Sequence, residues 1–418
     1  MRKITIVGGG QCGLQIGLAL LQDGYDVTVV TNRTAADVRS GKVLSSQCMF
    51  NTALQHERDM RLNFWEAECP QVSGVEYNVA GPAGSRPVHW SARLDAYAQS
   101  VDQRVKIPGW MDLFEQRGGR LLMEDAGIAE LERHAGDSEL VLVASGKGEI
   151  ARIFERDAAR SPFDKPMRAL ALTYVHNLEP RPGFSAVCFN VIPGIGEYFV
   201  FPALTISGPC EIMVYEGVIG GPMDECWRDA RTASDHIAAS KWVLDTWLPW
   251  EAARCRNVEL TDDNGRLVGR FPPAVRNPVA TLPSGRQVMG IADAVVLNDP
   301  LTGQGSNNAS KCARVVYDAI IAQGDKPFDA TWMQQTFDRY WDYAQWPTKW
   351  TSALLVPPEE PIPTVIAAAM DHPAFAREIS NAFDDPRKFE PWLYDRDAAA
   401  SKLAEYATTA ARLASDVR

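Results

Sequence analysis

The stretch Lys3-Ile4-Thr5-Ile6-Val7-Gly8-Gly9-Gly10-Gln11-Cys12-Gly13 decides the fold of this chain. Residues 3–7 are apolar and β-branched, which favours a buried strand, and the glycines that follow end it. Apolar residues at helical spacing continue from Leu14 to Leu21, and Asp26–Val30 is a second β-rich run. This order predicts a strand, a helix and a second strand that together form a βαβ unit.

Three glycines in this stretch have the spacing of a dinucleotide-binding turn. Gly8 permits the tight turn, Gly10 lets a pyrophosphate approach the backbone, and Gly13 allows close packing of helix on strand. The N-terminus of the following helix offers free N–H groups and a positive dipole end to phosphate. We therefore predict that a dinucleotide binds at this turn, with Cys12 beside it.

The end of the second strand does not identify the dinucleotide. An acidic residue that binds a ribose hydroxyl is expected there, but the chain has Thr31, Asn32 and Arg33. Arg33 could bind the 2′-phosphate of NADP. Alternatively, Thr31 or Asn32 could contact a ribose while Arg33 stacks on an adenine. From these residues alone, both interpretations stay open.

Length and composition exclude several classes of protein. The chain has 418 residues, 46% of them hydrophobic and 23% charged, which is typical of a globular protein. At roughly 150 residues per domain, this length suggests two to three domains. Lys and Arg number 42 against 53 Asp and Glu, so the net charge is −11. An acidic chain without a long basic run is a poor candidate for binding nucleic acid or an anionic membrane.

Cysteine spacing and hydropathy indicate a cytoplasmic protein without a metal site. The eight cysteines are scattered and form no C-x-x-C pair, and the six histidines show no metal-ligand spacing. No apolar run approaches the roughly 18 residues of a membrane helix. The first residues lead directly into the strand at residues 3–7, which does not fit a signal peptide.

Two stretches in the second half of the chain carry a further motif. Gly290-Ile291-Ala292-Asp293 places an Asp at the end of a strand, and Asp299-Pro300-Leu301-Thr302-Gly303-Gln304-Gly305 leads into a helix. With the N-terminal glycines, these stretches resemble the flavoprotein monooxygenases of the glutathione-reductase-like type. The resemblance implies that Asp293 contacts the ribityl or pyrophosphate region of FAD. It also implies a loop beside the isoalloxazine ring, for which we take Pro300, Gly303, Gln304, Gly305 and Asn307.

Two other stretches fit the same class. Val141–Gly146 resembles the strand that ends in Ala-Thr-Gly and touches the cofactor, with Ser in place of Thr, so Ala144, Ser145 and Gly146 are expected at FAD. Arg104 lies where this class places an Arg near the flavin or its phosphates. A simple ion pair is the alternative interpretation of Arg104.

Within this class, the chain resembles the styrene and indole monooxygenases. The N-terminal glycines, Ser161–Leu170 and Asp299–Asn307 carry this resemblance, which covers nearly the whole chain. These are the epoxidase components of two-component systems, and a separate NADH:flavin reductase supplies them with reduced FAD. The mid-chain Asp-Gly motif of single-component hydroxylases is missing, because the only Asp-Gly pair is the turn at Asp23-Gly24.

The resemblance implies a fold and a division of the chain. We predict an α/β fold with a glutathione-reductase-like, Rossmann-type FAD domain, an antiparallel β-sheet substrate domain and C-terminal helices. The FAD domain is discontinuous and is expected to comprise residues 1–64, 95–165 and 275–325. Residues 65–94 and 166–274 are expected to form the substrate domain, and residues 326–418 the helical region.

The resemblance also points to indole as the substrate. Ser45, Gln47 and Met49 match the pattern of the indole enzymes, and alternate positions share one face of an extended segment. The same comparison adds Val72, Val75 and Ala98 to the substrate pocket. We expect Gln47 or Ser45 to accept the indole N–H. An ordinary core role for Met49 and the valines is the alternative interpretation.

The expected reaction is epoxidation of the indole 2,3-double bond, which leads to indoxyl and indigo. The resemblance implies that reduced FAD and O2 form a C4a-hydroperoxide, whose electrophilic distal oxygen is attacked by the alkene to give the epoxide and the hydroxyflavin. The reductase is expected as a transient partner, and the chain could form a homodimer.

Other functions remain open from the sequence alone. The pocket could instead accept styrene-type alkenes or sulfides, or the chain could be a single-component NADPH-dependent oxidoreductase that uses Arg33. A halogenase of this fold would carry a W-x-W-x-I-P signature, which is missing; Lys106-Ile107-Pro108-Gly109-Trp110 matches it only superficially. A flavin-binding sensor or carrier would bind FAD without converting a substrate.

Overall fold

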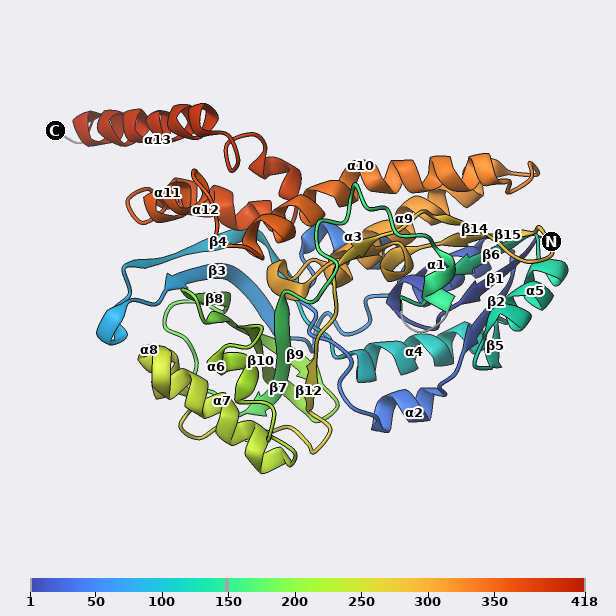
Figure 1. Cartoon of the computed structure of the whole chain (residues 1–418), viewed down its shortest axis with the longest axis horizontal. Helices are drawn as coiled ribbons and strands as arrows, with labels where there is room; N and C mark the ends of the chain where they lie inside the picture. Colours follow the sequence, from blue (N-terminus) through green and yellow to red (C-terminus); the bar gives the residue numbers. More distant parts are fainter. Residues whose placement is uncertain (1, 147–149, 417–418) are drawn as a thin grey trace.

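Two large β-sheets, each with helices on both faces, form the body of the protein in a computed structural model that describes residues 2–146 and 150–416 (Figure 1). The first sheet has the strand order β14-β15-β6-β1-β2-β5 and is parallel except for the β14–β15 pair. It begins with the predicted strand at residues 3–7. Its strands are β1 (Lys3–Val7), β2 (Asp26–Thr31), β5 (Arg120–Met123), β6 (Leu140–Val143), β14 (Val279–Thr281) and β15 (Gln287–Gly290).

Alternating side chains of this sheet bury two separate cores. Ile4 and Ile6 pack on one face beneath α1 (Gln11–Gln22), α4 (Gln103–Gln116) and α9 (Gly305–Gln323). Val7 and Val30 pack on the other face with Leu131 of α5 (Ile128–Asp137). Both faces are covered because successive residues of a strand point to opposite sides.

The second sheet is antiparallel except for the β3–β8 pair, as expected for the antiparallel β-sheet of the predicted substrate domain. Its strand order is β11-β7-β10-β9-β8-β3-β4, and β12 also pairs with β7. One face packs on α7 (Ala233–Trp247) and α8 (Pro249–Ala252). The strands are β3 (Gln71–Val79), β4 (Val88–Gln99), β7 (Arg168–His176), β8 (Ala186–Ile192), β9 (Gly196–Thr205), β10 (Gly208–Val218), β11 (Glu259–Leu260) and β12 (Arg266–Gly269).

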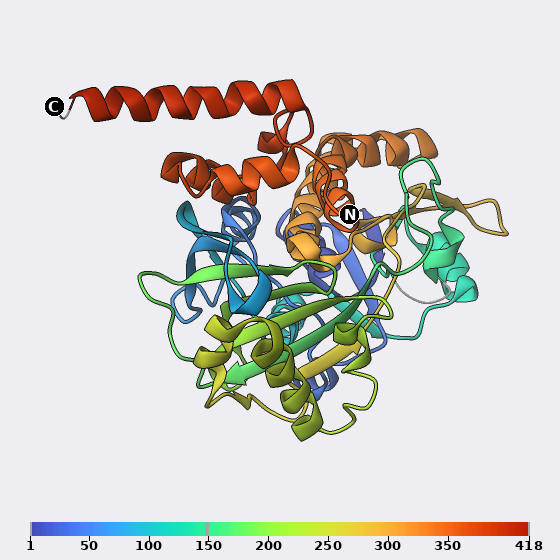
Figure 2. The ribbon, with the colours of Figure 1, turned by 60° about the vertical axis from the view of Figure 1, so that its left-hand side comes forward.

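Helices that follow the two sheets in sequence cover the other face of the second sheet. Trp350, Phe375 and Phe383 pack there with the aromatic residues of β8 and β9. The helix α13 leaves this layer and extends beyond the rest of the molecule (Figure 2). None of the helices within the described residues combines the length and apolar character needed to cross a bilayer. The helices are α10 (Ala330–Leu354), α11 (Ile362–Ala368), α12 (Pro373–Ala382) and α13 (Arg396–Asp416).

Several elements differ from the sequence-based expectation. The sequence pattern did not predict that β3 and β4 form one long ladder that reaches Gln99. Strand β5 and helix α5 were not predicted either; β5 is an edge strand of four residues whose short apolar run is not buried. The discontinuous division into three regions stays a prediction. Further short elements are α2 (Ala35–Ser40), α3 (Asn51–Asp59), α6 (Pro222–Glu225) and the paired strands β13 (Ala274–Val275) and β16 (Val296–Leu297).

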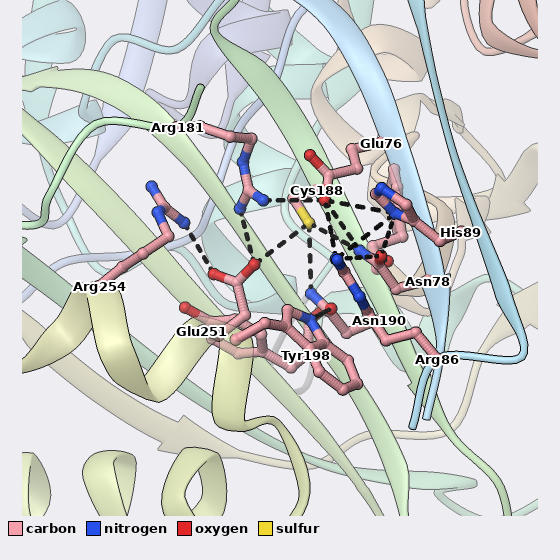
Figure 3. A network of polar contacts seen from close by, with 12 residues as sticks. Glu76, Asn78, Arg86, His89, Arg181, Cys188, Asn190, Tyr198, Glu251 and Arg254 are labelled. Atoms are coloured by element: carbon pink, nitrogen blue, oxygen red, sulfur yellow. Dashed lines mark hydrogen bonds and ion pairs between the residues drawn. The ribbon is translucent and has the colours of Figure 1, made fainter. Parts of the chain in front are cut away.

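A buried charged network fastens α8 to the second sheet (Figure 3). The Arg181 guanidinium donates to Glu251 at 2.9 Å and lies 3.0 Å from a carboxylate oxygen of Glu76. Arg254 donates to the second oxygen of Glu251 at 2.7 Å. Glu76, Cys188 and Glu251 have ligand atoms within 4.8 Å of one another, as a metal site would. Arg181 already supplies the positive charge at this place, so the cluster is a structural ion-pair network.

We expect Arg181→Met to destabilise the protein by about 3 kcal/mol, because it leaves buried carboxylates without their shared counter-ion. The loss should appear as a lower urea midpoint in equilibrium unfolding. Arg228→Met is the matched control, since Arg228 forms an exposed pair with Glu225 and should change stability by less than about 0.5 kcal/mol. Equal effects of the two substitutions would contradict the structural role of the network.

Candidate active site

The glycine turn after β1 lies at the carboxyl edge of the first sheet, where α1 begins. Gly8 has a φ of 128°, and a Cβ on it would lie 3.1 Å from Ala144. A Cβ on Gly13 would lie 2.1 Å from the carbonyl oxygen of Gly8, so only glycine fits there. Around Gly10, in contrast, no described atom lies within 4 Å of the Cβ position. The turn is therefore tightly packed toward the protein and open where the pyrophosphate is predicted.

Two helix N-termini meet at this turn. The Gln11 amide of α1 donates to the carbonyl oxygen of Ser306 in α9 at 3.1 Å. Within the described part of the chain, no side chain caps either helix, and neither has an acidic residue in its first turn. Both ends therefore present free N–H groups and positive dipole ends. Together with the open space at Gly10 and Gly305, they fit the diphosphate of a dinucleotide.

The predicted adenosine-side residues lie next to this turn. A Cβ on Gly9 would lie 2.9 Å from the Cβ of Thr31, which places the end of β2 against the glycines. Asn32 and Arg33 are exposed beyond it. The structure thus brings these residues to the same edge as the glycine turn. Their individual contacts to a cofactor stay predictions.

The loop after β6 and the region after β15 meet at the same edge. Ala144 and Ser145 contact the position of a Cβ on Gly8 at 3.1 Å. A Cβ on Gly146 would lie 2.6 Å from the Cβ of Asp293, so these two predicted residues are in contact. Four segments distant in sequence therefore converge as the sequence predicts. Cys12 differs, because its side chain is buried in the core beside Cys312 and only its backbone lies at the turn.

Arg104 is engaged elsewhere. Its side chain is 1% exposed and donates to Asp102 at 2.9 Å and to both carboxylate oxygens of Asp262 at 2.9 and 3.0 Å. Thr205 accepts a further bond at 3.1 Å. This arrangement corresponds to the ion-pair interpretation, and a flavin phosphate would have to displace Asp262. The role of Arg104 at the cofactor stays a prediction that the bound partners disfavour.

A small pocket, here called the inner chamber, lies between the second sheet and the turn at residues 300–303. Its walls are mainly apolar and include four phenylalanines, the hydroxyls of Ser46 and Thr302, and the thiol of Cys48. The inner chamber is lined by Ser46, Cys48, Phe50, Val187, Phe189, Phe199, Phe201, Val214, Pro300, Thr302 and Gly303.

A larger pocket, the outer chamber, continues from it beneath the C-terminal helices. The two chambers share Phe189, Phe199 and Thr302. Glu197 is the one charged residue of the outer wall. The rest of its lining is Tyr77, Val191, Leu301, Trp350, Leu354, Pro358, Ile362, Ile366, Ile379, Phe383, Phe389 and Leu393.

Two side-chain amides bind the turn at residues 300–303, which lies between the chambers and the start of α9. The Asn307 amide donates to the carbonyl oxygens of Cys48 and Gly303, and its oxygen accepts from the Phe50 N–H at 2.8 Å. Gln304 donates to the carbonyl oxygen of Phe383 at 3.0 Å. Both were predicted at the cofactor, and the structure shows their side chains bound to protein instead. They position the turn on which the inner chamber depends.

The predicted substrate residues divide into two groups. Ser45 donates to the Gln47 carbonyl at 3.1 Å, and the Gln47 amide donates to the Tyr174 hydroxyl at 3.3 Å. Ser45 and Gln47 thus share a face, as predicted. The Met49 sulfur accepts from Lys106 at 3.2 Å, so Met49 lies in a different environment. The residues between them, Ser46 and Cys48, are the ones that line the inner chamber.

Val72, Val75 and Ala98 are fully buried in the hydrophobic core on the C-terminal-helix face of the second sheet. Val72 pairs with Ala98 across β3 and β4. They are absent from the described lining of both chambers. Their alternative interpretation as core residues fits this location.

Sequence reasoning missed the aromatic walls. Phe199 and Phe201 stand two apart in β9 and therefore share a face. Every residue of β9 is buried, so the strand shows no polar alternation that would separate a cavity face from a core face. The spacing of Phe199 and Phe201 was the one signal in this strand that could have indicated an aromatic wall.

Comparison with known proteins agrees with this geometry. Residues 146–254 match the family model of the styrene monooxygenase A substrate-binding domain. Styrene monooxygenase StyA of Pseudomonas fluorescens is 29% identical over 97% of both chains. Among solved structures, the flavin-dependent brominase Bmp2 superposes with a TM-score of 0.66 at 15% identity, covering 97% of this chain and 99% of that chain. A flavoprotein/dehydrogenase from Cytophaga hutchinsonii gives a TM-score of 0.67 at 11% identity, covering 98% of this chain and 99% of that chain.

These likenesses confirm two expectations. The chain resembles the styrene monooxygenase type, and its fold is that of Rossmann-type flavoproteins. The relatives named styrene monooxygenase also support the expectation that the chain is an oxidoreductase. The solved structures, being distant in sequence, bear on the fold alone.

Gly10 and Gly13 provide a matched pair for testing the cofactor edge. We expect Gly10→Ala to weaken binding of reduced FAD at least tenfold without lowering the melting temperature, because the methyl group enters open space that the pyrophosphate needs. Gly13→Ala should destabilise the fold itself, because its methyl group meets the Gly8 carbonyl. Flavin titration and thermal unfolding separate the two effects. Unchanged FAD affinity in Gly10→Ala would place the cofactor elsewhere.

Proposed function

We propose that this chain, a flavin-dependent monooxygenase of the styrene monooxygenase type, epoxidises the 2,3-double bond of indole. The inner chamber carries the proposal. Three phenylalanines, Phe189, Phe199 and Phe201, offer ring faces and edges to a flat bicyclic substrate. The chamber also borders the Pro300–Gly303 turn, which by resemblance lies beside the isoalloxazine ring. A small aromatic alkene bound there would be adjacent to the cofactor.

We propose further that FAD enters reduced, from a separate NADH:flavin reductase. Bound reduced FAD would supply, with O2, the electrophilic oxygen, so the chain needs no nucleophile or metal of its own. Its own residues bind the alkene, orient it and exclude water. Thr302 and Thr351 hydroxyls satisfy each other at 2.5 Å, which keeps the shared wall free of an unpaired polar group. Burial raises the pKa of the Cys48 thiol to about 12, so the thiol stays protonated and unreactive.

Gln47 and Ser45 remain our proposed anchors for the indole N–H. The Gln47 carbonyl accepts one bond from Ser45 and retains a second acceptor site. Its amide is fixed by Tyr174, whose hydroxyl also donates to the Ser45 carbonyl at 2.8 Å. Neither Gln47 nor Ser45 is in the described lining of the inner chamber, so an indole would reach the Gln47 carbonyl only where its N–H passes between Ser46 and Cys48 to the opposite face of this segment.

A styrene-type alkene epoxidase or sulfoxidase is the second candidate. It is favoured by the StyA relative, which is named a styrene monooxygenase. The apolar lining of the inner chamber accepts a hydrocarbon as readily as an indole.

Indole conversion tests the proposal directly. Cells that express the chain should turn blue, because indole epoxide rearranges to indoxyl and oxidises to indigo. The purified chain should convert indole when a flavin reductase, NADH, FAD and air are supplied, and should not oxidise NADH without the reductase. Folded protein that forms styrene oxide but no indigo would establish the second candidate instead.

Gln47→Val tests the anchor. We expect the ratio of kcat/KM for indole to that for styrene to fall about tenfold, or ~1.4 kcal/mol, because valine cannot accept the N–H. Gln334→Val is the control, since this exposed glutamine of α10 bonds only to Asp338 within the described residues. An unchanged ratio in Gln47→Val would remove Gln47 from substrate recognition.

A further inference from the structure

Four ionisable side chains lie behind the Asp299–Gly303 turn, which contributes to the lining of both chambers. They are Arg168 at the start of β7, Glu197 of β9, Glu216 of β10 and Asp299 at the start of the turn. None is more than 9% exposed. Three carboxyl groups thus face one guanidinium in a nearly water-free space, and neither the cofactor edge nor the substrate anchors described above use them.

Arg168, the one cation of this cluster, already forms an ion pair with Glu197. Arg168 donates to both oxygens of Glu197, at 2.8 and 2.9 Å. A third donor of Arg168 bonds to the carbonyl oxygen of Leu355 at the end of α10, at 3.0 Å. Glu197 and Glu216 lie directly opposite each other on β9 and β10, so their side chains share a face. Glu216 therefore lies beside a negative charge and lacks a cation of its own.

The partner of Glu216 is another carboxyl group. Asp299 is the acid that faces it, and both oxygens of Glu216, like Oδ2 of Asp299, lack a hydrogen-bond donor among the described residues. Two ionised carboxylates are acceptors only, so a bond between these two groups forms only when one of them carries a proton. Asp299 accepts from the Leu301 N–H at 3.1 Å, which favours the ionised form of Asp299. The proton therefore belongs on Glu216.

Electrostatics agrees with this assignment. Burial, followed by the charge of Asp299, holds the pKa of Glu216 well above its usual value. Burial also raises the pKa of Asp299, while its bonds to Glu216 and Leu301 lower it. The other ionisable groups that face the pair are Arg168 and Glu197. With all three acids ionised, the cluster would carry two uncompensated negative charges.

We propose that Glu216 is protonated at neutral pH, donates a hydrogen bond to Asp299, and thereby holds the Asp299–Gly303 turn against the second sheet. Glu216 is a positioning residue, because it acts on the chambers through this turn. Leu301 and Thr302 line the outer chamber, and Pro300, Thr302 and Gly303 line the inner one. The consequence for substrate rests on the proposed function, whereas the protonation state does not.

The sign of the pH dependence follows from linkage. A carboxyl group whose pKa is higher in the folded than in the unfolded state contributes stability below its ordinary pKa. That stability is lost as the pH rises toward the folded pKa. Glu216→Gln retains an N–H donor to Asp299 and has no charge to lose. The variant should therefore keep the turn in place at alkaline pH, where the wild-type protein begins to release it.

Infrared difference spectroscopy of the flavin-free protein tests the proton. At about pH 7, the wild-type protein should show a protonated-carboxyl C=O band of which one component disappears in Glu216→Gln. Glu259→Gln, an exposed acid of β11, is the control and should leave the band unchanged. Glu211 is also expected to contribute to the protonated-carboxyl band, because burial raises the pKa of Glu211 to about 7. The Glu211→Gln variant identifies this contribution. The same band in wild type and Glu216→Gln would overturn the proposal.

The pH profile tests positioning. Between about pH 7 and about pH 9, the melting temperature should fall more in the wild-type protein than in Glu216→Gln, and the KM for indole should rise only in the wild type. Glu216→Leu, which has no donor, should raise KM at every pH, and rescue by Gln distinguishes positioning from simple packing. Parallel profiles in wild type and Glu216→Gln would refute the positioning role. If the infrared band behaves as expected but indole is not converted, the proposed function is wrong, whereas the protonation of Glu216 is still supported.

Discussion

A single buried amide connects the cofactor side of this protein to its substrate side. Asn307 lies in the first turn of α9, and its side chain bonds to the backbone at Cys48, Phe50 and Gly303. Both ends of the amide are used in a water-free environment, where an unpaired polar group costs several kcal/mol, on the order of 2–7. The start of α9, the segment beside the inner chamber and the turn at residue 303 are therefore fixed relative to one another.

The parallel sheet was predictable because its signals are local. Gly8, Gly10 and Gly13 follow an apolar strand directly, and the carboxyl ends of parallel strands must meet at one edge. The edge strand β5 carries a weak signal, because it has only four residues and none of them is buried. Strand β3 pairs with its neighbour β4 and also with β8, which begins more than a hundred residues after β3 ends, so this second pairing has no local signal.

The site was predictable only in part, for the same reason. The convergence of Gly8, Ala144, Gly146 and Asp293 follows from strand order. The partners of Arg104 and Gln47 do not, because Asp262 and Tyr174 lie 158 and 127 positions away in the sequence. Predicting the lining of the chambers would require knowing which face of β9 the C-terminal helices cover. Because β9 is buried on both faces, its sequence does not distinguish one face from the other.

The helices that close the outer chamber are synthesised after every strand of both sheets. During translation, both sheets can form before α10, α11 and α12 have been synthesised. Until then, Phe189, Phe199 and their neighbours are not covered by these helices. The nascent protein thus passes through a stage with an open aromatic surface that is prone to association. A chaperone that recognises exposed apolar surface would find its target there, and a stop codon before α10 would leave a chain that lacks both the cover of the outer chamber and part of the core around α1 and α9.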